Sequence, residues 1–408
     1  MKKQERIDRL RERIRKQLKK WDVPSVSICI IKDHEVCMAE GIGQRDQEAG
    51  ISADAETLYQ IASCTKAFTA AAVAMLATEG KLDMDRPVRD YIPSFRLHDE
   101  YATAHLTIRD FLSHRSGLPR HEYAWYGTGF SRDELMGHLK DLWLTAPIRY
   151  KFQYSNFNYL IAGELIEAVS GMKFEDYLEQ KILLPLGMTH SKVYIEDIRS
   201  ADNKALPYDH TEEYTMEGIR QIDFYQSPAE NAESRTGDPT AAAGCISSCA
   251  QDMAHWVEFM MGNGEWQGQQ RIRPDLMRLL TTPHITLADS PLYSPQRTMN
   301  SYALGWQVHS YRGYKMCEHG GNINGFSTET AFLPELGLGV FVSANMNVTL
   351  LADAIVMDVL DTFLDQADTD WYDRLYQGNE EMFDSVRAAF AAPAEQAVSN
   401  THPSHPMA

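Results

Sequence analysis

The strand-like segments of this 408-residue chain lie at its two ends, and this distribution limits the folds that it can adopt. Near the N-terminus, "SVSICIIKDHEVCMAEGIGQRD" has two β-rich runs around a polar turn at residues 32–34, a pattern typical of a hairpin. Strand signals return late, in "YALGWQVHS", "GYKMCEHGG", "FSTETAFLPE" and "LGVFVSAN". Residues 81–240 between them are mostly helical with loops. The sequence therefore predicts an α/β fold of the α+β type, in which both termini build one sheet and carry an inserted, mainly helical region.

This pattern divides the chain into three parts. Residues 1–80 and 241–370 are expected to form a sheet domain, and residues 81–240 a helical domain. Residues 371–408 are expected to form a C-terminal helix and a tail rich in Pro, Ala and Ser that looks like a linker. The cleft between the sheet and the helical region is the expected position of a site.

Composition and charge exclude two classes of partner. The chain has 57 acidic and 39 basic residues, which gives a formal net charge of -18. Nucleic acid is not an expected partner, because phosphate binding needs a basic face. A content of 44% hydrophobic and 24% charged residues is that of a soluble globular protein. No apolar run is long enough to cross a bilayer, so no membrane span is expected.

The N-terminal segment "MKKQERIDRLRERIRKQLKKWDVP" is basic and amphipathic. Ile7, Leu10, Ile14 and Leu18 recur at helical spacing, which predicts a helix packed onto the body of the protein. A membrane-surface helix is the alternative, although acidic residues interrupt the basic run. The segment lacks the apolar region of a secretory signal, and the six cysteines form no C-x-x-C pair. We therefore expect free thiols and a cytoplasmic location.

The segment "ASCTKAF" places Ser63 and Lys66 three residues apart at the start of a predicted helix over residues 62–79. Positions i and i+3 share a helix face, so the lysine can reach the serine hydroxyl. A serine becomes a good nucleophile when a neighbouring base takes its proton, and the N–H groups of a helix start favour developing negative charge. The alternative is a serine that only caps the helix. A second S-x-x-K, Ser170 to Lys173, follows a helix instead of opening one.

Two further motifs each occur once in the chain. Tyr154 and Asn156 form a Y-x-N in "FQYSNFNYL", and residues 319–321 form an H-G-G in "EHGGNINGFST". Side chains at i and i+2 of an extended segment point the same way, so Tyr154 and Asn156 are expected to face one pocket. The two glycines would let a substrate backbone lie flat against a strand edge.

The order S-x-x-K, Y-x-N and a glycine-rich strand motif resembles the serine β-lactamase and penicillin-binding protein superfamily. Tyrosine in the second motif is similar to the class C β-lactamases, the D-alanyl-D-alanine carboxypeptidases, and related esterases and D-aminopeptidases. The resemblance covers roughly residues 20–365 and implies an antiparallel sheet flanked by helices. The segment "DWYDRL" and the terminal "PSHPMA" resemble the junction of some family peptidases with a C-terminal lipocalin-like domain.

The resemblance also implies a role for each motif residue. Ser63 would attack a carbonyl carbon, while Lys66 and Tyr154 move its proton to the leaving group. Asn156 would position Lys66 and the substrate amide. The backbone N–H groups of Ser63 and Asn322 would form the oxyanion hole. No cofactor and no metal are expected.

The third motif departs from the family pattern. His319 stands where many members have lysine, and Gly320 stands where many have a threonine or serine hydroxyl. Those groups help to hold a substrate carboxylate in relatives. Gly321 stands where the family motif has its glycine. A neutral or weakly charged imidazole suggests an ester, an amide or the N-terminal side of a peptide as substrate.

The expected function is a serine hydrolase that acts through an acyl-enzyme on a small molecule or short peptide. The alternatives are a β-lactamase or penicillin-binding protein that acts on β-lactams, a covalent sensor that barely deacylates, and a non-catalytic scaffold; a homo-oligomer is also considered. Cys64 is an alternative nucleophile, although no cysteine-enzyme pattern supports it. His114 and His121 in "SHRSGLPRHE" lack metal-site spacing and are interpreted as loop residues.

Overall fold

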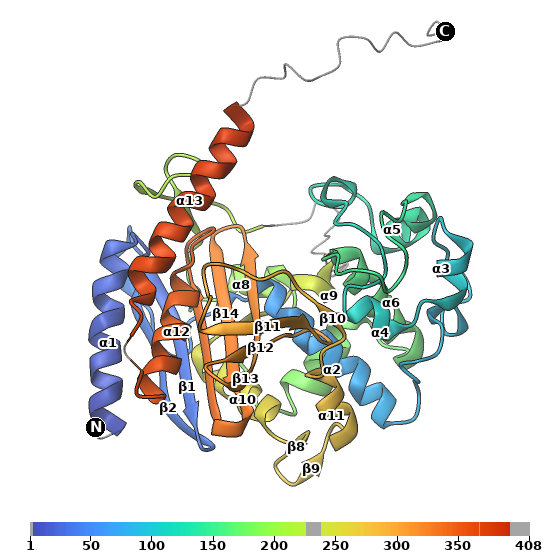
Figure 1. Cartoon of the computed structure of the whole chain (residues 1–408), viewed down its shortest axis with the longest axis horizontal. Coiled ribbons are helices and arrows are strands. Elements are labelled where there is room, and N and C mark those ends of the chain that lie inside the picture. Colours follow the sequence, from blue (N-terminus) through green and yellow to red (C-terminus); the bar gives the residue numbers. More distant parts are fainter. Residues whose placement is uncertain (1–2, 226–237, 367, 392–408) are drawn as a thin grey trace, which may run out of the picture.

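A computed structural model describes residues 3–225, 238–366 and 368–391 (Figure 1). Within these ranges, nine strands form one sheet in the order β10, β11, β12, β13, β14, β15, β1, β2, β3, with antiparallel neighbours. N-terminal β1 pairs with C-terminal β15, and Val26 lies opposite Ala344. The predicted α+β fold with a sheet built from both termini is therefore confirmed. The segment predicted to be a linker, residues 392–408, lies outside the described residues.

The predicted N-terminal hairpin is also confirmed. β1 and β2 are joined at Asp33 and His34, whose φ angles are 53° and 65°. Two positive φ angles fit a type I′ turn, whose twist matches that of the paired strands. The strands of the sheet are β1 (Ser25–Lys32), β2 (Glu35–Asp46), β3 (Ile51–Ser52), β10 (Ile285–Thr286), β11 (Arg297–Tyr302), β12 (Gln307–Tyr311), β13 (Tyr314–Ile323), β14 (Phe326–Leu333) and β15 (Leu338–Ala344).

Helices cover both faces of the sheet and create two cores (Figure 1). One face carries α1 (Lys3–Lys20), α12 (Leu351–Phe363) and α13 (Trp371–Ala391). The other carries α10 (Ala250–Met261), which is joined to α2 (Thr65–Thr78) through stacked rings of Phe68 and Trp256, 3.6 Å apart at their centroids.

Strand β1 shows why the two cores form. Val26, Ile28 and Ile30 point into the core with α1 and α12, whereas Cys29 and Ile31 point into the core with α10. Successive side chains of a strand alternate between the faces of a sheet, so a strand with apolar side chains on both faces must be covered on both sides.

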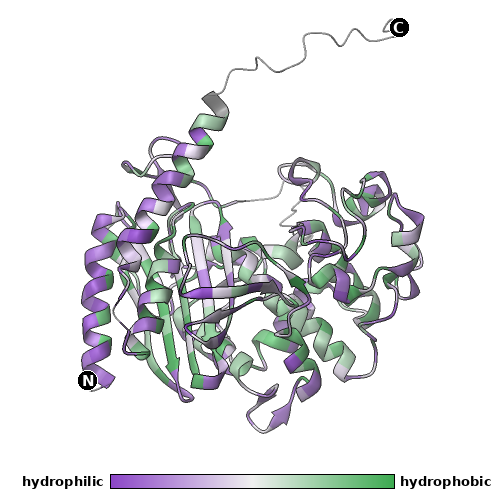
Figure 2. Ribbon diagram, in the orientation of Figure 1, coloured by the Kyte–Doolittle hydropathy of each residue, from purple (hydrophilic) through white to green (hydrophobic). Residues whose placement is uncertain are grey.

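The predicted N-terminal helix packs onto the protein as expected. Ile7, Leu10, Ile14 and Leu18 of α1 are all buried. Figure 2 shows α1 as mainly hydrophilic on the outside, beside a largely hydrophobic strand. Because its apolar face is already covered, the membrane-surface alternative loses its support. In the part of the chain that the structure describes, no helix is long and apolar enough to cross a membrane.

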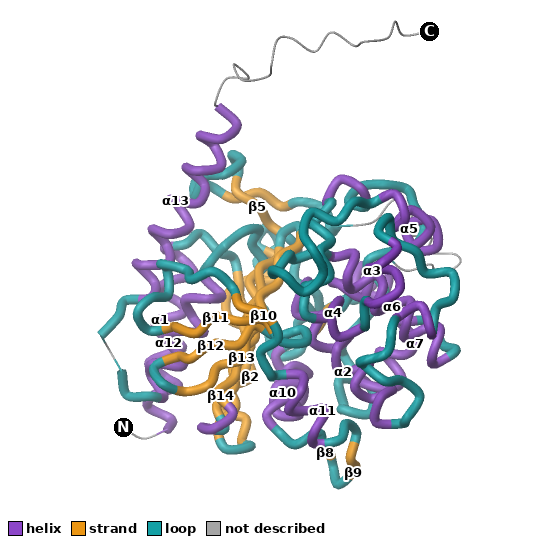
Figure 3. The backbone as a smooth tube through the Cα atoms, turned by 45° about the vertical axis from the view of Figure 1, so that its right-hand side comes forward, coloured by secondary structure: helices purple, strands orange, loops and turns teal. Residues whose placement is uncertain are grey.

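The region between the two sheet-forming parts contains short helices and loops, and its helices α3 to α7 gather on the side away from α1 and α12 (Figure 3). Its helix α6 (Asn156–Ser170) packs against α2. The region also holds a small hairpin, β5 (Tyr208–His210) with β6 (Ile219–Gln221), which the sequence did not predict. Other elements are α3 (Glu100–His105), α4 (Ile108–Leu112), α5 (Arg132–His138), α7 (Phe174–Tyr177), α8 (Ile195–Ser200), α9 (Ala241–Gly244), α11 (Pro274–Leu280), β4 (Tyr59–Gln60), β7 (Ser247–Ser248), β8 (Glu265–Trp266) and β9 (Gln269–Gln270).

Candidate active site

Ser63 lies in a tight turn between the sheet and α2. The single 3-10 turn η1 (Ala62–Cys64) leads directly into α2, and Ala62 has a positive φ of 46°. Such strain in a residue with a side chain persists only where the surrounding structure enforces it. Strand β13 passes over this turn, because a Cβ on Gly321 would lie 2.3 Å from Ile61 O and 3.0 Å from Ser63 N. Only a glycine permits this approach.

Two side chains contact the Ser63 hydroxyl. Lys66 Nζ lies 3.0 Å from Ser63 Oγ, and the Tyr154 hydroxyl donates a hydrogen bond to the same oxygen at 2.9 Å. Lys66 also donates to the carbonyl oxygen of Ala243 at 2.9 Å. Lys66 is completely buried, whereas Ser63 is partly exposed. The turn therefore presents the hydroxyl outward and holds the amine beneath it.

Burial sets the protonation of both partners. It lowers the pKa of Lys66 well below its usual 10.5, and the Arg120 cation lowers that pKa further. Burial also raises the pKa of Tyr154, so the phenol keeps its proton at neutral pH. A neutral amine can accept the Ser63 proton, and a protonated phenol can donate one. The trio can therefore support nucleophilic attack and protonation of a leaving group.

His114 supports the segment that carries Tyr154. The two ring centroids lie 4.4 Å apart, and His114 Nδ1 accepts hydrogen bonds from Ser155 N at 3.2 Å and Asn158 Nδ2 at 3.0 Å. Burial lowers the pKa of His114, so the ring is neutral. The interpretation of His114 as a loop residue misses this role, because the two segments meet only in the fold.

Asn156 departs from its expected place. It begins α6 and is not part of an extended run, so the i, i+2 argument does not apply to it. Its Oδ1 is buried without a hydrogen-bond partner among the described residues, and Lys66 is held by Ala243 instead. The structure therefore brings Tyr154 to Ser63 but does not show Asn156 bonded to Lys66.

The H-G-G segment forms the edge of β13 next to Ser63. His319 is buried, its Nδ1 donates to Gly320 O at 2.7 Å, and its Nε2 lies 2.9 Å from the Tyr302 hydroxyl, which donates to it. Burial and the nearby Lys66 lower the pKa of His319 to about 3. The imidazole is therefore a neutral group held by two partners.

These elements line one cavity of about 390 Å³. Ser63, Tyr154 and residues 319–322 all contribute to its wall, so the structure brings the three sequence motifs together. Arg120 also lines it, with its guanidinium 5.4 Å from the Tyr154 ring centroid and hydrogen-bonded to Glu122. A larger cavity of about 830 Å³ lies along α1 and β2 and contains none of the motif residues.

Sequence reasoning missed two acidic residues of the cavity wall, Glu329 on β14 and Asp353 on α12. A signal for Glu329 existed, since β14 is buried at every position and a glutamate in such a strand needs an explanation. Asp353 carried no signal, because an acidic residue in the first turn of a helix is ordinary.

Cys64 does not fit the role of nucleophile. Its side chain is buried, and its Sγ donates a hydrogen bond to His319 O at 3.0 Å. Burial raises the pKa of the thiol, so the reactive thiolate is disfavoured.

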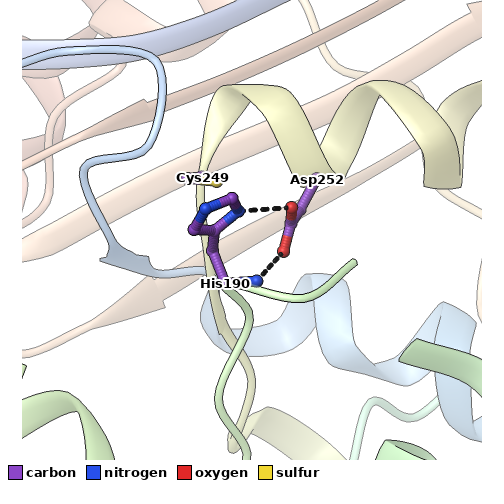
Figure 4. Close-up of side chains that lie close together, drawn as sticks. All are labelled: His190, Cys249 and Asp252. Carbon is purple, nitrogen blue, oxygen red and sulfur yellow. Dashed lines mark hydrogen bonds and ion pairs between the residues drawn. The ribbon is translucent and has the colours of Figure 1, made fainter. Parts of the chain in front are cut away.

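A second cluster, far from Ser63 in the sequence, has metal-ligand chemistry: His190, Cys249 and Asp252 (Figure 4). Asp252 accepts hydrogen bonds from the backbone N–H groups of His190 and Ser191, and His190 Nδ1 lies 3.1 Å from Asp252 Oδ1. Burial raises the pKa of Cys249 to about 12, so it is a thiol. The cluster's polar atoms hold the start of α10 against the loop that carries His190 and Ser191, and no metal is assigned to it.

The chain is similar to known proteins over most of its length. A family model described as Beta-lactamase matches residues 10–356. Among curated proteins, "Unguisins hydrolase ungD'" of Aspergillus campestris is 29% identical and covers 93% of this chain, and "Unguisins hydrolase ungD" of Aspergillus violaceofuscus is 30% identical and covers 81%. The chain spans 70% and 60% of the lengths of these two relatives.

Two solved structures are similar to this fold. The octameric penicillin-binding protein homologue from Pyrococcus abyssi superposes with a TM-score of 0.75 and 26% identity, covering 88% of this chain and 78% of that one. A class C beta-lactamase superposes with a TM-score of 0.71 and 17% identity, covering 90% and 97%. At that identity, the second likeness concerns the fold alone.

Proposed function

Because the chain belongs to the Beta-lactamase family, we propose that it is a serine hydrolase that acts through an acyl-enzyme on small esters, amides or peptides. The observation that carries the proposal is the contact of Ser63 Oγ with Lys66 Nζ at 3.0 Å and with the Tyr154 hydroxyl at 2.9 Å. The hydrolase names of the fungal relatives support a hydrolytic activity.

In the proposed reaction, Ser63 Oγ attacks the substrate carbonyl carbon while its proton passes to Lys66 Nζ. The bond to the leaving group then breaks, and the leaving group takes a proton from Tyr154, which Lys66 reprotonates. Water attacks the resulting acyl-enzyme, gives its proton to the same pair, and the acid product leaves as Ser63 regains its proton.

The oxyanion is proposed to bind the backbone N–H groups of Ser63 and Asn322. The close passage of β13 over the Ser63 turn at Gly321 supports this assignment, since it brings the two backbones together at the cavity. Preorganised donors of this kind typically contribute about 10²- to 10³-fold in rate.

The wall next to β13 supports a substrate without a free carboxylate at this point. His319 is neutral, and Gly320 provides no hydroxyl. A contact of Asn156 with the substrate amide is proposed on the family resemblance of the Y-x-N motif alone, since Asn156 is not among the residues that line the cavity.

Arg120 favours a second candidate, a hydrolase or covalent sensor of β-lactams. This residue lies on a loop outside β13 and places a permanent cation on the cavity wall. There the cation can hold a substrate carboxylate. Its existing pair with Glu122 at 3.0 Å reduces that role.

Assembly into a homo-oligomer is a further proposal, supported by the octameric state named for the archaeal homologue.

Labelling with a fluorophosphonate tests the proposed nucleophile. We expect intact-mass analysis to show one adduct on the parent protein, and none on Ser63→Ala. Ser170→Ala is the matched control, because it removes the serine of the second S-x-x-K and should keep the adduct. Equal labelling of Ser63→Ala, or an adduct on Cys64, would contradict the assignment.

A further inference from the structure

The cavity beside Ser63 has an acidic wall, defined here as Glu329 and Asp353. Both side chains line the same cavity as Ser63. They come from β14 and α12, two elements that no catalytic motif involves. Carboxylates at the wall of a buried pocket need a partner, because an ionised carboxylate without one is unfavourable there.

Arg297, a buried cation near the acidic wall, is already engaged. Arg297 forms an ion pair with Glu318, and His309 Nε2 lies 2.9 Å from the same Glu318 oxygen. The Arg297 guanidinium also stacks on the Tyr293 ring, 3.6 Å from its centroid. Arg297 therefore neutralises Glu318 first and offsets the charge of the acidic wall only in part.

Glu329 has an unused hydrogen-bonding atom. Its side chain is 5% exposed, and its Oε1 is buried without a partner among the described residues. Its Oε2 lies under Gly320, where a Cβ would approach it to 2.8 Å. Loss of the family's hydroxyl residue at Gly320 therefore makes room for a carboxyl group beside the strand edge.

Asp353 completes the acidic wall. Its Oδ1 accepts a hydrogen bond from the Tyr293 hydroxyl at 2.8 Å, which fixes the orientation of the carboxyl group. Burial and repulsion among the carboxylates raise the pKa of Asp353 to about 6 and raise the pKa of Glu329 well above its usual range. A bound cation would relieve both effects.

We propose that the acidic wall binds an ammonium group of the substrate, so that the preferred substrates are esters, amides or short peptides that carry an amine; this inference rests on the proposed function. The cavity of about 390 Å³ suits a ligand of that size. Among the described residues, Glu318, Glu329 and Asp353 are not a set of three converging metal ligands, which favours an organic cation over a metal ion.

The test uses nitroanilide pairs that differ by one charge. Alanine nitroanilide is compared with 2-methylpropanoyl nitroanilide, in which a methyl group replaces the α-ammonium. Nα-acetyl-lysine nitroanilide is compared with the Nα-acetyl-norleucine compound, which tests a side-chain ammonium. In at least one pair, the charged member should have a kcat/KM higher by about tenfold or more, as expected for a charged hydrogen bond.

Variants then assign the effect to the acidic wall. Glu329→Gln and Asp353→Asn should each reduce the ratio of charged to neutral kcat/KM by about tenfold, mainly through KM. This ratio cancels any general loss of activity. Glu335→Gln is the control, because Glu335 is exposed on the turn after β14 and does not line the cavity. It should leave the ratio unchanged.

Different failures identify different errors. Equal or better kcat/KM for the neutral members, no turnover of either charged nitroanilide by a protein that cleaves a neutral nitrophenyl ester, or an unchanged ratio in both variants would overturn the inference. No Ser63-dependent reaction with any ester, amide or serine probe would instead overturn the proposed function.

Discussion

Ser63 and Lys66 differ in exposure although they lie one helical turn apart. The hydroxyl faces the cavity, while the amine is buried among Ala243 O, the Tyr154 ring and the Tyr159 ring. In the proposed mechanism, this difference separates the reactive hydroxyl from the base that activates it. It also gives Lys66 its low pKa, because water cannot reach the ammonium form.

Replacement of the two proton carriers should reduce turnover without unfolding the protein. We expect Lys66→Ala and Tyr154→Phe each to lower kcat by about 10²- to 10⁴-fold, since positioned acid-base groups typically contribute that much. The double variant should lose about as much as either single variant, because the groups act as a unit. Tyr123→Phe, at an exposed position, is the control. A near-parental kcat for folded Tyr154→Phe would remove Tyr154 from the mechanism.

His319 should make stability depend on pH. A histidine in the unfolded chain takes up a proton near pH 6.5, whereas the pKa of His319 in the fold is about 3. Between these values the unfolded state binds one more proton, so the folded protein loses stability as pH falls. Relative to His319→Asn, the parent should lose about 1.6 kcal/mol between pH 6.5 and pH 5. Urea denaturation of both proteins at several pH values measures this difference, and a constant difference would show that His319 is protonated as an ordinary histidine.

Helix α13 covers one face of the sheet and also lines the cavity. Its Met382 lines the cavity together with residues 348–350 of the loop before α12. In that loop Val348 has a positive φ of 45°, a strained conformation for a β-branched residue. Asn379 of α13 holds the loop, because its Oδ1 accepts from Leu350 N at 2.8 Å and its Nδ2 donates to Val348 O at 3.3 Å.

Removal of this support should affect both stability and substrate binding. We expect Asn379→Ala to lower the free energy of unfolding by about 1 to 3 kcal/mol, since it leaves buried backbone groups unpaired. It should also raise KM, because the loop forms part of the cavity wall. Denaturation and steady-state kinetics check the two effects, with exposed Gln377→Ala on the same helix as control. An Asn379→Ala protein with parental KM would show that α13 only covers the sheet.

At the scale of the whole molecule, the net charge and the acidic wall of the cavity favour the same kind of ligand, a cationic one. The chain carries a net charge of -18, and Glu329, Asp353 and Arg120 line its cavity. An acidic protein repels anionic ligands and attracts cationic ones. The net charge therefore acts against substrates that present a free carboxylate.

Small esters or amino-acid amides should accordingly be better substrates than β-lactams with a carboxylate. We expect kcat/KM for a short-chain nitrophenyl ester or an amino-acid nitroanilide to exceed that for nitrocefin by about one to two decades, the value of a missing charged hydrogen bond. If nitrocefin is instead the best of the three by about tenfold, a true β-lactamase becomes the better account. In that case, a lower kcat/KM of Arg120→Gln for nitrocefin would identify Arg120 as the cation that holds the carboxylate.

The fold class could be predicted because its signals are local. The apolar spacing of α1, the apolar run of β1 and the turn at residues 32–34 each depend on near neighbours in the chain, and each appears as expected. The candidate site was predictable to the level of three motifs, since each is a short pattern. The end of the helix at Gly80, where φ is 72°, could be predicted for the same reason, because a glycine after a helix is a local signal.

Tertiary structure alone determined how those motifs come together and which protonation states their side chains have. Sequence spacing could place Ser63 near Lys66, but it could not place His114 against Tyr154, Glu329 beside Gly320, or Asn379 against the 348–350 loop. These partners are brought together by strand pairing and by the packing of helices and loops. It also placed Asn156 on a helix where an extended segment was expected. The neutral forms of Lys66 and His319 arise from burial, and burial is a property of the assembled core that no local pattern contains.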